Sequence, residues 1–383
     1  MLNSLISIYI VVCVSLILFN IGYTLNKSYH HTYVTRKHSF FKKMFIKESR
    51  LLATKDMLSR DYIQYLLQKL HNYKFLLLLM SYLKELASED KPLTQHFHYA
   101  LAPILFQLAP IYAKKPLDEQ AYYAYVIATF EFSHEPISLP LTTTLLNFLN
   151  SPSIHTRHNA LHAICRLGSL ELLLPALDLL DTSPFPYHPK LLTNGLLSFT
   201  GDIDNLNVAL LKSLDHFSPH TQATIIDYLC LRNYNVANAF THYLEKDSGD
   251  LQLRYAVIRY YTNLPCPDAY PYFIKFINIL GNDYWTLRAL SATALMHYPT
   301  PLSISTLIKY LADTNWFVRN NCAQSLIYFN LPISKLLAIL KIPDTFAQDI
   351  LSYHLERHPK YAILPEVIAL KEEKLLSPMA SAI

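Results

Sequence analysis

Apolar positions recur at spacings of three and four residues along most of this chain. Two stretches show the pattern best: in each, an arginine is followed at +3, +4 and +7 by small or apolar residues, first at Arg288 and then at Arg319. That spacing places the apolar residues on one face of an α-helix. The sequence has no Asn-Gly or Asp-Gly hairpin signal. The pattern therefore predicts an all-α fold.

The same arrangement repeats every 31 to 34 residues between positions 157 and 319. The slot taken by the arginine is filled in turn by Arg157, Pro189, Gln222, Arg254, Arg288 and Arg319. Each unit also contains a second apolar segment, such as 170–180, 270–280 or 302–311, introduced by a Pro or Gly break. Two short helices joined by a turn cannot bury their apolar faces alone, so neighbouring units must stack. We therefore predict an α-solenoid of helix pairs.

Flanking segments extend the predicted array in both directions. Residues 56–88, 92–112 and 117–150 are interpreted as three further helix pairs without the arginine signature. Residues 345–357 and 364–376 are interpreted as a last, capping pair. The predicted organisation after residue 54 is then 55–150 degenerate repeats, 151–340 regular repeats and 341–383 capping helices.

The regular repeats resemble a known family. Segments 283–295 and 313–326 both begin with Asp and place Trp three residues before Arg, with an Ala-containing helix following. This resembles HEAT repeats, specifically the short bacterial kind. The resemblance implies a ladder of hydrogen-bonded ion pairs within the turns, with a structural role, formed by Asp283, Arg288, Asp313 and Arg319. The units at Gln222 and Pro189 depart from the pattern and are expected to interrupt the ladder.

The N-terminal residues have a different pattern. Residues 5–25 contain no charged side chain over 21 positions, which at about 1.5 Å per residue spans about 30 Å, the thickness of a bilayer core. No Lys or Arg precedes this run and no small-x-small cleavage site closes it, so an uncleaved transmembrane anchor over 1–26 is favoured over a signal peptide.

Charge then predicts the orientation of that anchor. The basic juxtamembrane segment, 27–54, holds seven cations and one anion between Lys27 and Arg50, whereas the remainder of the chain after residue 50 has a net charge of −2. The positive-inside bias places this segment and the solenoid in the cytoplasm, with the N-terminus outside the cell membrane, and we expect the segment to be solvated and to face lipid headgroups. The slightly acidic array argues against nucleic-acid binding.

Candidate chemistry is sparse. His158, His162 and Cys165 fall at i, i+4 and i+7 of one predicted helix, a spacing that metal ligands can use, yet no fourth ligand is identifiable. The sequence lacks GxGxxG, GxxxxGK[ST], GxSxG and HExxH. We therefore assign no catalytic, cofactor-binding or metal residues, expect no cofactor, and interpret the chain as a non-enzyme.

Aromatic residues are the more suggestive excess, with 28 Tyr and 19 Phe. Two interpretations stay open for those near helix starts: filling of wide gaps between helices with hydroxyls reaching water, or an aromatic surface that grips a protein partner. The residues concerned are Tyr122, Tyr123, Tyr125, Tyr260, Tyr261, Tyr270, Tyr272, Tyr284 and Trp285.

Together these observations predict a single-pass membrane protein whose cytoplasmic solenoid is a scaffold or adaptor for a protein partner. Resemblance to bacterial membrane proteins of this kind implies an accessory subunit of a membrane or envelope-associated complex, for example one with a glycosyltransferase. The alternative is an enzyme with its site in the solenoid concavity, metal-dependent through His158 and His162. A small-molecule ligand is not expected.

Overall fold

A computed structural model describes residues 15–16, 39–54, 57–130, 132, 137–245, 250–369 and 371. The predicted anchor over 5–25 lies outside the described residues apart from positions 15 and 16. Within the described ranges, no helix combines the length and apolar character needed to cross a bilayer. The same ranges contain helices and turns but no strand, as the 3-and-4 spacing predicts.

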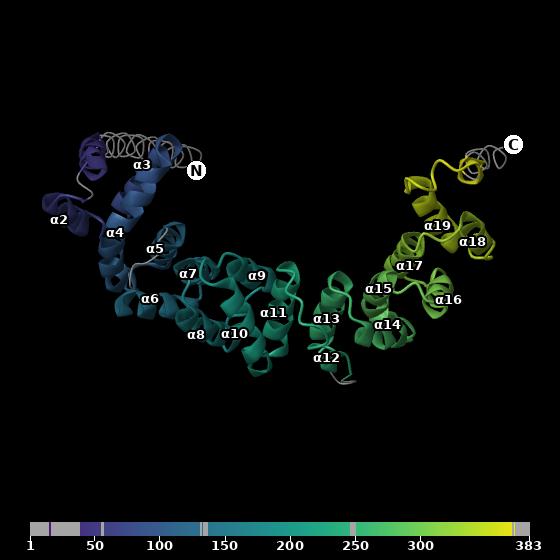
Figure 1. Cartoon of the computed structure of the whole chain (residues 1–383). Coiled ribbons are helices and arrows are strands. Elements are labelled where there is room, and N and C mark those ends of the chain that lie inside the picture. Colours follow the sequence, from purple (N-terminus) through teal and green to yellow (C-terminus); the bar gives the residue numbers. More distant parts are fainter. Residues whose placement is uncertain are drawn as a thin grey trace, which may run out of the picture. The chain divides into compact units, whose positions relative to one another are not determined.

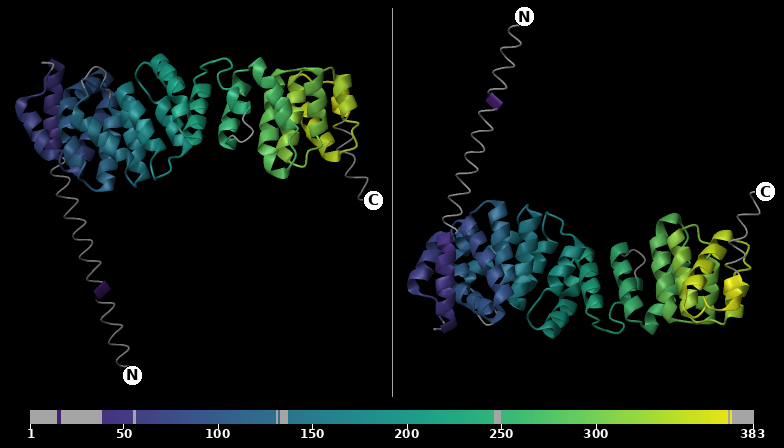
Figure 2. Two further views of the ribbon diagram at one scale, coloured as in Figure 1. Left: turned by 90° about the horizontal axis from the view of Figure 1, so that it is seen from below. Right: turned by 90° about the horizontal axis from the view of Figure 1, so that it is seen from above.

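The chain forms two compact units. Unit 1 contains the described residues up to Pro186 together with Ser198–Gly201, and unit 2 contains Tyr187–Leu197 and the described residues from Asp202 onward. Each unit is built from helices stacked in two layers (Figures 1 and 2).

Unit 1 begins with a helix over residues 39–54. Its labelled helices are α2 (Arg60–Lys69), α3 (Tyr73–Glu89), α4 (Lys91–Tyr112), α5 (Leu117–Thr129), α6 (Leu139–Leu149), α7 (Ile154–Leu167) and α8 (Leu170–Asp181). In one layer α3 contacts α5 and α5 contacts α7, while in the other α2 contacts α4, α4 contacts α6 and α6 contacts α8. Each helix thus packs against the one two places along the chain, which is the contact pattern of a solenoid.

Unit 2 repeats this arrangement. Its α-helices are α9 (Pro189–Leu197), α10 (Ile203–Ser213), α11 (Pro219–Leu231), α12 (His242–Glu245), α13 (Leu251–Asn263), α14 (Tyr270–Ile277), α15 (Trp285–Ala294), α16 (Pro301–Tyr310), α17 (Trp316–Tyr328), α18 (Ile333–Ile339) and α19 (Thr345–Arg357). Four 3-10 turns lie between them, η1 (Leu214–His216), η2 (Pro267–Ala269), η3 (Asn282–Tyr284) and η4 (Leu295–His297). The odd-numbered helices α9 to α19 form one continuous stack of neighbours. The solenoid-like fold is confirmed for each unit.

Two N-terminal features differ from the sequence expectation. Residues 92–112, expected as a helix pair, lie in the single 22-residue helix α4, which contains Pro103 and Pro110 without ending at either. The helix over 39–54 belongs to the folded unit, because Phe41 and Phe45 are buried. Their rings stack on Tyr82 of α3 at centroid distances of 5.9 and 5.6 Å.

That first helix is nevertheless two-sided. Phe41, Phe45 and Leu52 face the protein, whereas Lys43 and Lys47 are exposed on the opposite side. The buried Glu48 accepts hydrogen bonds from the amide and hydroxyl of Ser59. The expectation of a wholly solvated segment is therefore wrong for residues 39–54, since burial of its aromatic face competes with solvation, while the basic face stays exposed.

A side chain near the start of several helices reaches back to a main-chain carbonyl in the preceding turn. We call this the turn-capping contact; its donor–acceptor distance is 2.7–3.2 Å, and the acceptor lies five to eight residues earlier. Donors are Gln120, Arg157, Gln222, Arg288, Arg319 and Gln348. These bonds give turn carbonyls a side-chain donor; those of Leu214 and Gly281 also accept from the main-chain amides of Phe217 and Tyr284.

The expected ladder of ion pairs is only partly present. Arg288 Nε donates to Asp313 Oδ2 at 2.8 Å, and both side chains are about 6% exposed. Arg319 instead donates to the main-chain oxygens of Asp313 and Thr314. Asp283 lies in an exposed turn with no partner among the described residues, so its assignment to the ladder is wrong. Gln222 has no charge to form an ion pair, but it keeps the turn-capping contact, so the series of turn-capping contacts continues through its repeat.

Buried and half-buried tyrosines also tie neighbouring repeats together within each unit. Their hydroxyls donate to main-chain carbonyls 18 to 42 residues earlier at 2.7–2.8 Å. The donors are Tyr112, Tyr123, Tyr260, Tyr298 and Tyr361. The gap-filling interpretation is thus correct for Tyr123 and Tyr260, but their hydroxyls reach carbonyls and not water, because these groups are fully buried.

Two of the six glycines meet at the end of α7. Gly168 ends that helix with a left-handed backbone, φ +69°. A Cβ added there would lie 2.8 Å from the amide nitrogen of Gly201. The close approach lets Thr200 donate from its amide to the carbonyl of Cys165. Glycine is required at 168 by both the positive φ and the neighbouring backbone.

Candidate functional site

The histidines singled out from the sequence do lie together on α7. The rings of His158 and His162 meet edge to face with centroids 4.5 Å apart. His162 Nδ1 lies 3.2 Å from the hydroxyl of Ser198. Cys165, one turn further on, is completely buried.

The electrostatics of this group favour neutral side chains. Burial lowers the pKa of His158 and of His162 from 6.5; His155 lowers that of His158 further, and His158 that of His162. Burial raises the pKa of the Cys165 thiol far above its ordinary value. Among the described residues, no cluster of three or more His, Cys, Asp or Glu side chains is arranged to hold a metal ion. A buried neutral thiol is a poor ligand and a poor nucleophile.

A second group of residues forms an open pocket of about 350 Å³ between α17 and α19 of unit 2. We call it the aromatic pocket, and it is lined by Trp316, Arg319, Phe346, Asp349, Ile350 and Tyr353. Its three aromatic side chains are unusually open to solvent: Trp316 is 51% exposed, Phe346 63% and Tyr353 45%. A group of large exposed apolar side chains on one surface is typical of an interaction site.

Local capping places these side chains. Asn315 begins α17 by accepting a hydrogen bond from the amide of Phe317, which sets Trp316 in the first turn. Asp344 begins α19 in the same way through the amide of Ala347, which sets Phe346 in its first turn. Both rings remain outside the core, with Trp316 51% and Phe346 63% exposed.

Cations hold the aromatic rings in place. The Arg319 guanidinium, fixed by its turn-capping contact, lies 5.0 Å from the ring centre of Phe346. Arg357 lies 4.1 Å from the ring of Tyr353 and donates to its hydroxyl. Such cation–π contacts contribute about 0.5–1 kcal/mol each at exposed sites and restrict ring motion.

The aromatic surface extends toward α15. The ring of Phe317 stacks on Trp285 at 5.3 Å and meets Trp316 edge to face at 5.2 Å. Phe317 is itself 52% exposed. Trp285 of α15 and Phe317 of α17 thus continue the aromatic surface from Trp316, which lines the pocket.

Of these residues, the sequence reasoning named Trp285 as a candidate for partner binding but did not select Phe317, Phe346 or Tyr353. A usable signal was present: an aromatic residue one or two positions after an Asn or Asp helix cap, at 316–317 after Asn315 and at 346 after Asp344.

Comparisons with known proteins give the following. No protein-family model and no curated protein sequence matches the chain. Among solved structures, an engineered protein aligns with 14% identity over 71% of this chain and 86% of its own, with a TM-score of 0.33. Human deoxyhypusine hydroxylase in complex with glycerol aligns with 15% identity over 77% of this chain and 95% of its own, with a TM-score of 0.26. These similarities do not indicate a function for the chain.

Proposed function

We propose that this protein is a non-catalytic scaffold, held at the cytoplasmic face of a membrane, that binds a protein partner through the aromatic pocket. The observation that carries the proposal is the set of exposed Trp316, Phe346 and Tyr353 around one pocket. Trp and Tyr are the residues most favoured as binding anchors, because they bury a large area at low cost in side-chain entropy.

Shape and charge at the pocket define the partner's contact. A pocket of about 350 Å³ lined by Trp316, Ile350 and Tyr353 has room for one or two apolar side chains. Arg357 stands beside Tyr353 and would attract an acidic residue next to those anchors. The partner is thus a protein segment with an apolar anchor flanked by a carboxylate.

The membrane part of the proposal draws on two features. Residues 5–25 have the length and composition of an anchor, and the helix over 39–54 keeps Lys43, Lys47 and Arg50 exposed on one face. Cations in that position would contribute about 1 kcal/mol each near anionic headgroups. We infer an accessory subunit of a membrane or envelope-associated complex.

Photocrosslinking tests the docking surface. Tyr353→benzoylphenylalanine in the full chain should give a partner adduct in membranes, and adding Trp316→Ala should abolish it. The matched control is Leu231→benzoylphenylalanine, since Leu231 is 62% exposed on α11 but does not line the pocket. Equal adducts at both positions, or none at 353, would reject the aromatic pocket as the docking site.

Topology is tested separately. A reporter fused after Ile383 should be active only in its cytoplasmic form, because the positive-inside bias retains the basic segment in the cytoplasm. Activity of an exported reporter would overturn the membrane orientation while leaving the aromatic pocket unaffected.

A further inference from the structure

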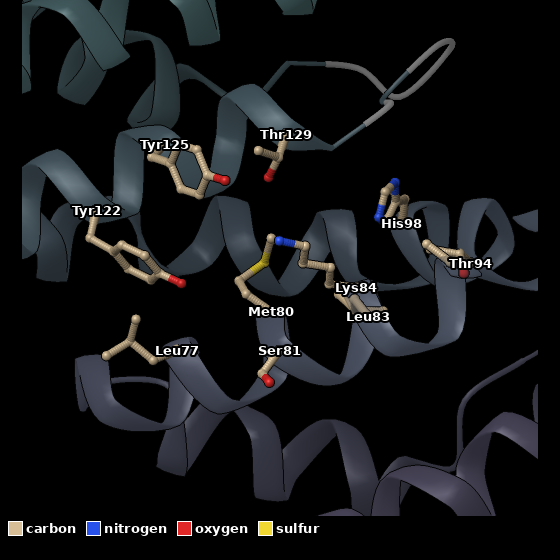
Figure 3. A pocket seen from close by; sticks show the side chains of 11 residues that line it. Leu77, Met80, Ser81, Leu83, Lys84, Thr94, His98, Tyr122, Tyr125 and Thr129 are labelled. Atoms are coloured by element: carbon tan, nitrogen blue, oxygen red, sulfur yellow. The ribbon is translucent and has the colours of Figure 1, made fainter. Parts of the chain in front are cut away.

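A larger cavity lies in unit 1, away from the aromatic pocket. It has a volume of about 530 Å³ and opens between α3, α4 and α5 (Figure 3). This volume falls within the roughly 300–1,000 Å³ of small-ligand pockets. The lining residues are Leu77, Met80, Ser81, Leu83, Lys84, Ala87, Thr94, His98, Tyr122, Tyr125 and Thr129.

One part of the lining is apolar. Leu77, Met80, Leu83 and Ala87 all come from α3 and form a strip along the cavity. Leu77 is 37% exposed, so part of this strip is open to water. Covering apolar surface of this kind stabilises by about 25 cal/mol per Å², which favours a ligand with an apolar body.

The polar ends of three other side chains meet in the same space. Figure 3 shows the amine of Lys84 and the hydroxyls of Tyr122 and Tyr125 pointing toward the centre of the cavity. None of the three groups has a hydrogen-bond or ion-pair partner among the described residues. The Thr129 hydroxyl, by contrast, already donates to the carbonyl of Val126. The unpartnered donors that point toward the centre are thus one ammonium and two phenols, while the Ser81 hydroxyl also belongs to the lining.

The charge of Lys84 is not neutralised locally. No Asp or Glu lines the cavity. The nearest carboxylate along α3, that of Glu85, is turned to Lys42 on the helix over 39–54, with an N–O distance of 2.9 Å. Burial, followed by the neighbouring Tyr125 and Tyr73, raises the pKa of Tyr122 to about 12, so its phenol keeps its proton at neutral pH. The cavity therefore presents donors and one positive charge to a ligand.

We propose that this cavity binds an apolar monocarboxylate, with the carboxylate held by Lys84, Tyr122 and Tyr125 and the hydrocarbon body lying along Leu77 and Met80. A single ammonium with two neutral donors matches one negative charge. A phosphate ester carries up to two charges and is more often held by several cations or by a bidentate arginine. The site is independent of the scaffold function proposed above.

Equilibrium dialysis of radiolabelled octanoate tests the assignment, with the full chain reconstituted in phosphatidylcholine nanodiscs and empty nanodiscs as the blank. We expect one saturable site. Lys84→Gln should weaken octanoate binding about tenfold, because it removes a charge-assisted hydrogen bond. Tyr122→Phe should weaken it less. Lys91→Gln, the same charge change on α4 outside the lining, should leave the affinity unchanged.

Two further ligands, octanol and octyl phosphate, test whether the cavity prefers a carboxylate head group. Octanol, which lacks the charge, should bind weakly and equally to the wild-type chain and to Lys84→Gln. Octyl phosphate binding more tightly than octanoate would overturn the carboxylate assignment. Absence of saturable octanoate binding, or an equal loss with Lys91→Gln, would overturn the site itself.

Discussion

The buried ion pair between α15 and the turn before α17 allows a sharp test of what holds neighbouring repeats together. Arg288 donates to Asp313 through Nε at 2.8 Å and Nη2 at 3.3 Å. The Asp313 carboxylate also accepts from the amide of Asn315 at 2.8 Å. Asp313→Ala removes these three bonds together and leaves the Arg288 charge buried.

The structure sets the size of the effect. Removing one partner of a buried pair costs about 3–5 kcal/mol. Arg288 retains two hydrogen bonds to the carbonyls of Ile279 and Gly281, so its guanidinium is not fully orphaned. We therefore expect a loss near the lower end of that range, about 3 kcal/mol.

A second arginine–carboxylate pair supplies the control. Arg259 and Asp227 form a bidentate pair between α13 and α11, with N–O distances of 2.7–3.1 Å. Its side chains are 42% and 31% exposed, against 6% for both members of the buried pair. Asp227→Ala should cost about 1 kcal/mol or less, because solvent screens the exposed pair.

Hydrogen–deuterium exchange of the full chain is the suitable assay, since repeat arrays open locally and a single global free energy is poorly defined for them. The measured quantity is the free energy of local opening for peptides covering α15 to α17, and for α11 to α13 in the control. Equal losses for the two variants would refute the claim that burial, and not the pairing itself, sets the cost.

Three further predictions concern other features of the fold. Tyr361→Phe should destabilise the C-terminal repeats by about 1–2 kcal/mol, measured by the same exchange assay, because the buried carbonyl of Leu331 loses its donor. Gly168→Ala should lower the free energy of local opening around α7 by about 2 kcal/mol or more in the exchange assay, since its φ is +69° and the new Cβ would contact Gly201; unchanged exchange there would contradict this. Burial, and next Arg357, lower the pKa of His354 below 6.5, so the unfolded chain binds its proton more readily. The local stability of α19 should therefore be full above about pH 6.5 and fall as the pH drops below it, and His354→Gln should make that fall shallower in exchange measured at different pH values.

The sequence was sufficient to predict the helices whose apolar residues follow the 3-and-4 spacing. The predicted segments 170–180 and 345–357 correspond to α8 (Leu170–Asp181) and α19 (Thr345–Arg357). Helix length in the N-terminal part was harder to predict: residues 92–112 were expected as a helix pair. They lie instead in the single helix α4, which accommodates Pro103 and Pro110 in its interior.

The candidate sites were less accessible to prediction, for a physical reason. The aromatic pocket and the unit 1 cavity each join side chains from different helices, so their existence depends on how those helices pack. Lys84 and Tyr122, for example, have no local pattern that relates them. The turn-capping contacts at Gln120 and Gln348 were not predicted, because these positions lack the arginine of the repeat pattern, although an amide nitrogen can make the same bond.

The turn-capping contact also bears on how freely such a chain can change its sequence. Its acceptor is always a main-chain oxygen, which every residue type possesses, so a substitution in the turn leaves the bond intact as long as the backbone path is kept. Only the donor is chemically restricted, to a side chain with an N–H and sufficient reach. The acceptor lies five residues before Gln120 and eight before Gln222, so turns of different length and different sequence support the same contact. Replacement of the donor side chain should therefore disturb a repeat more than replacement of any residue in its turn.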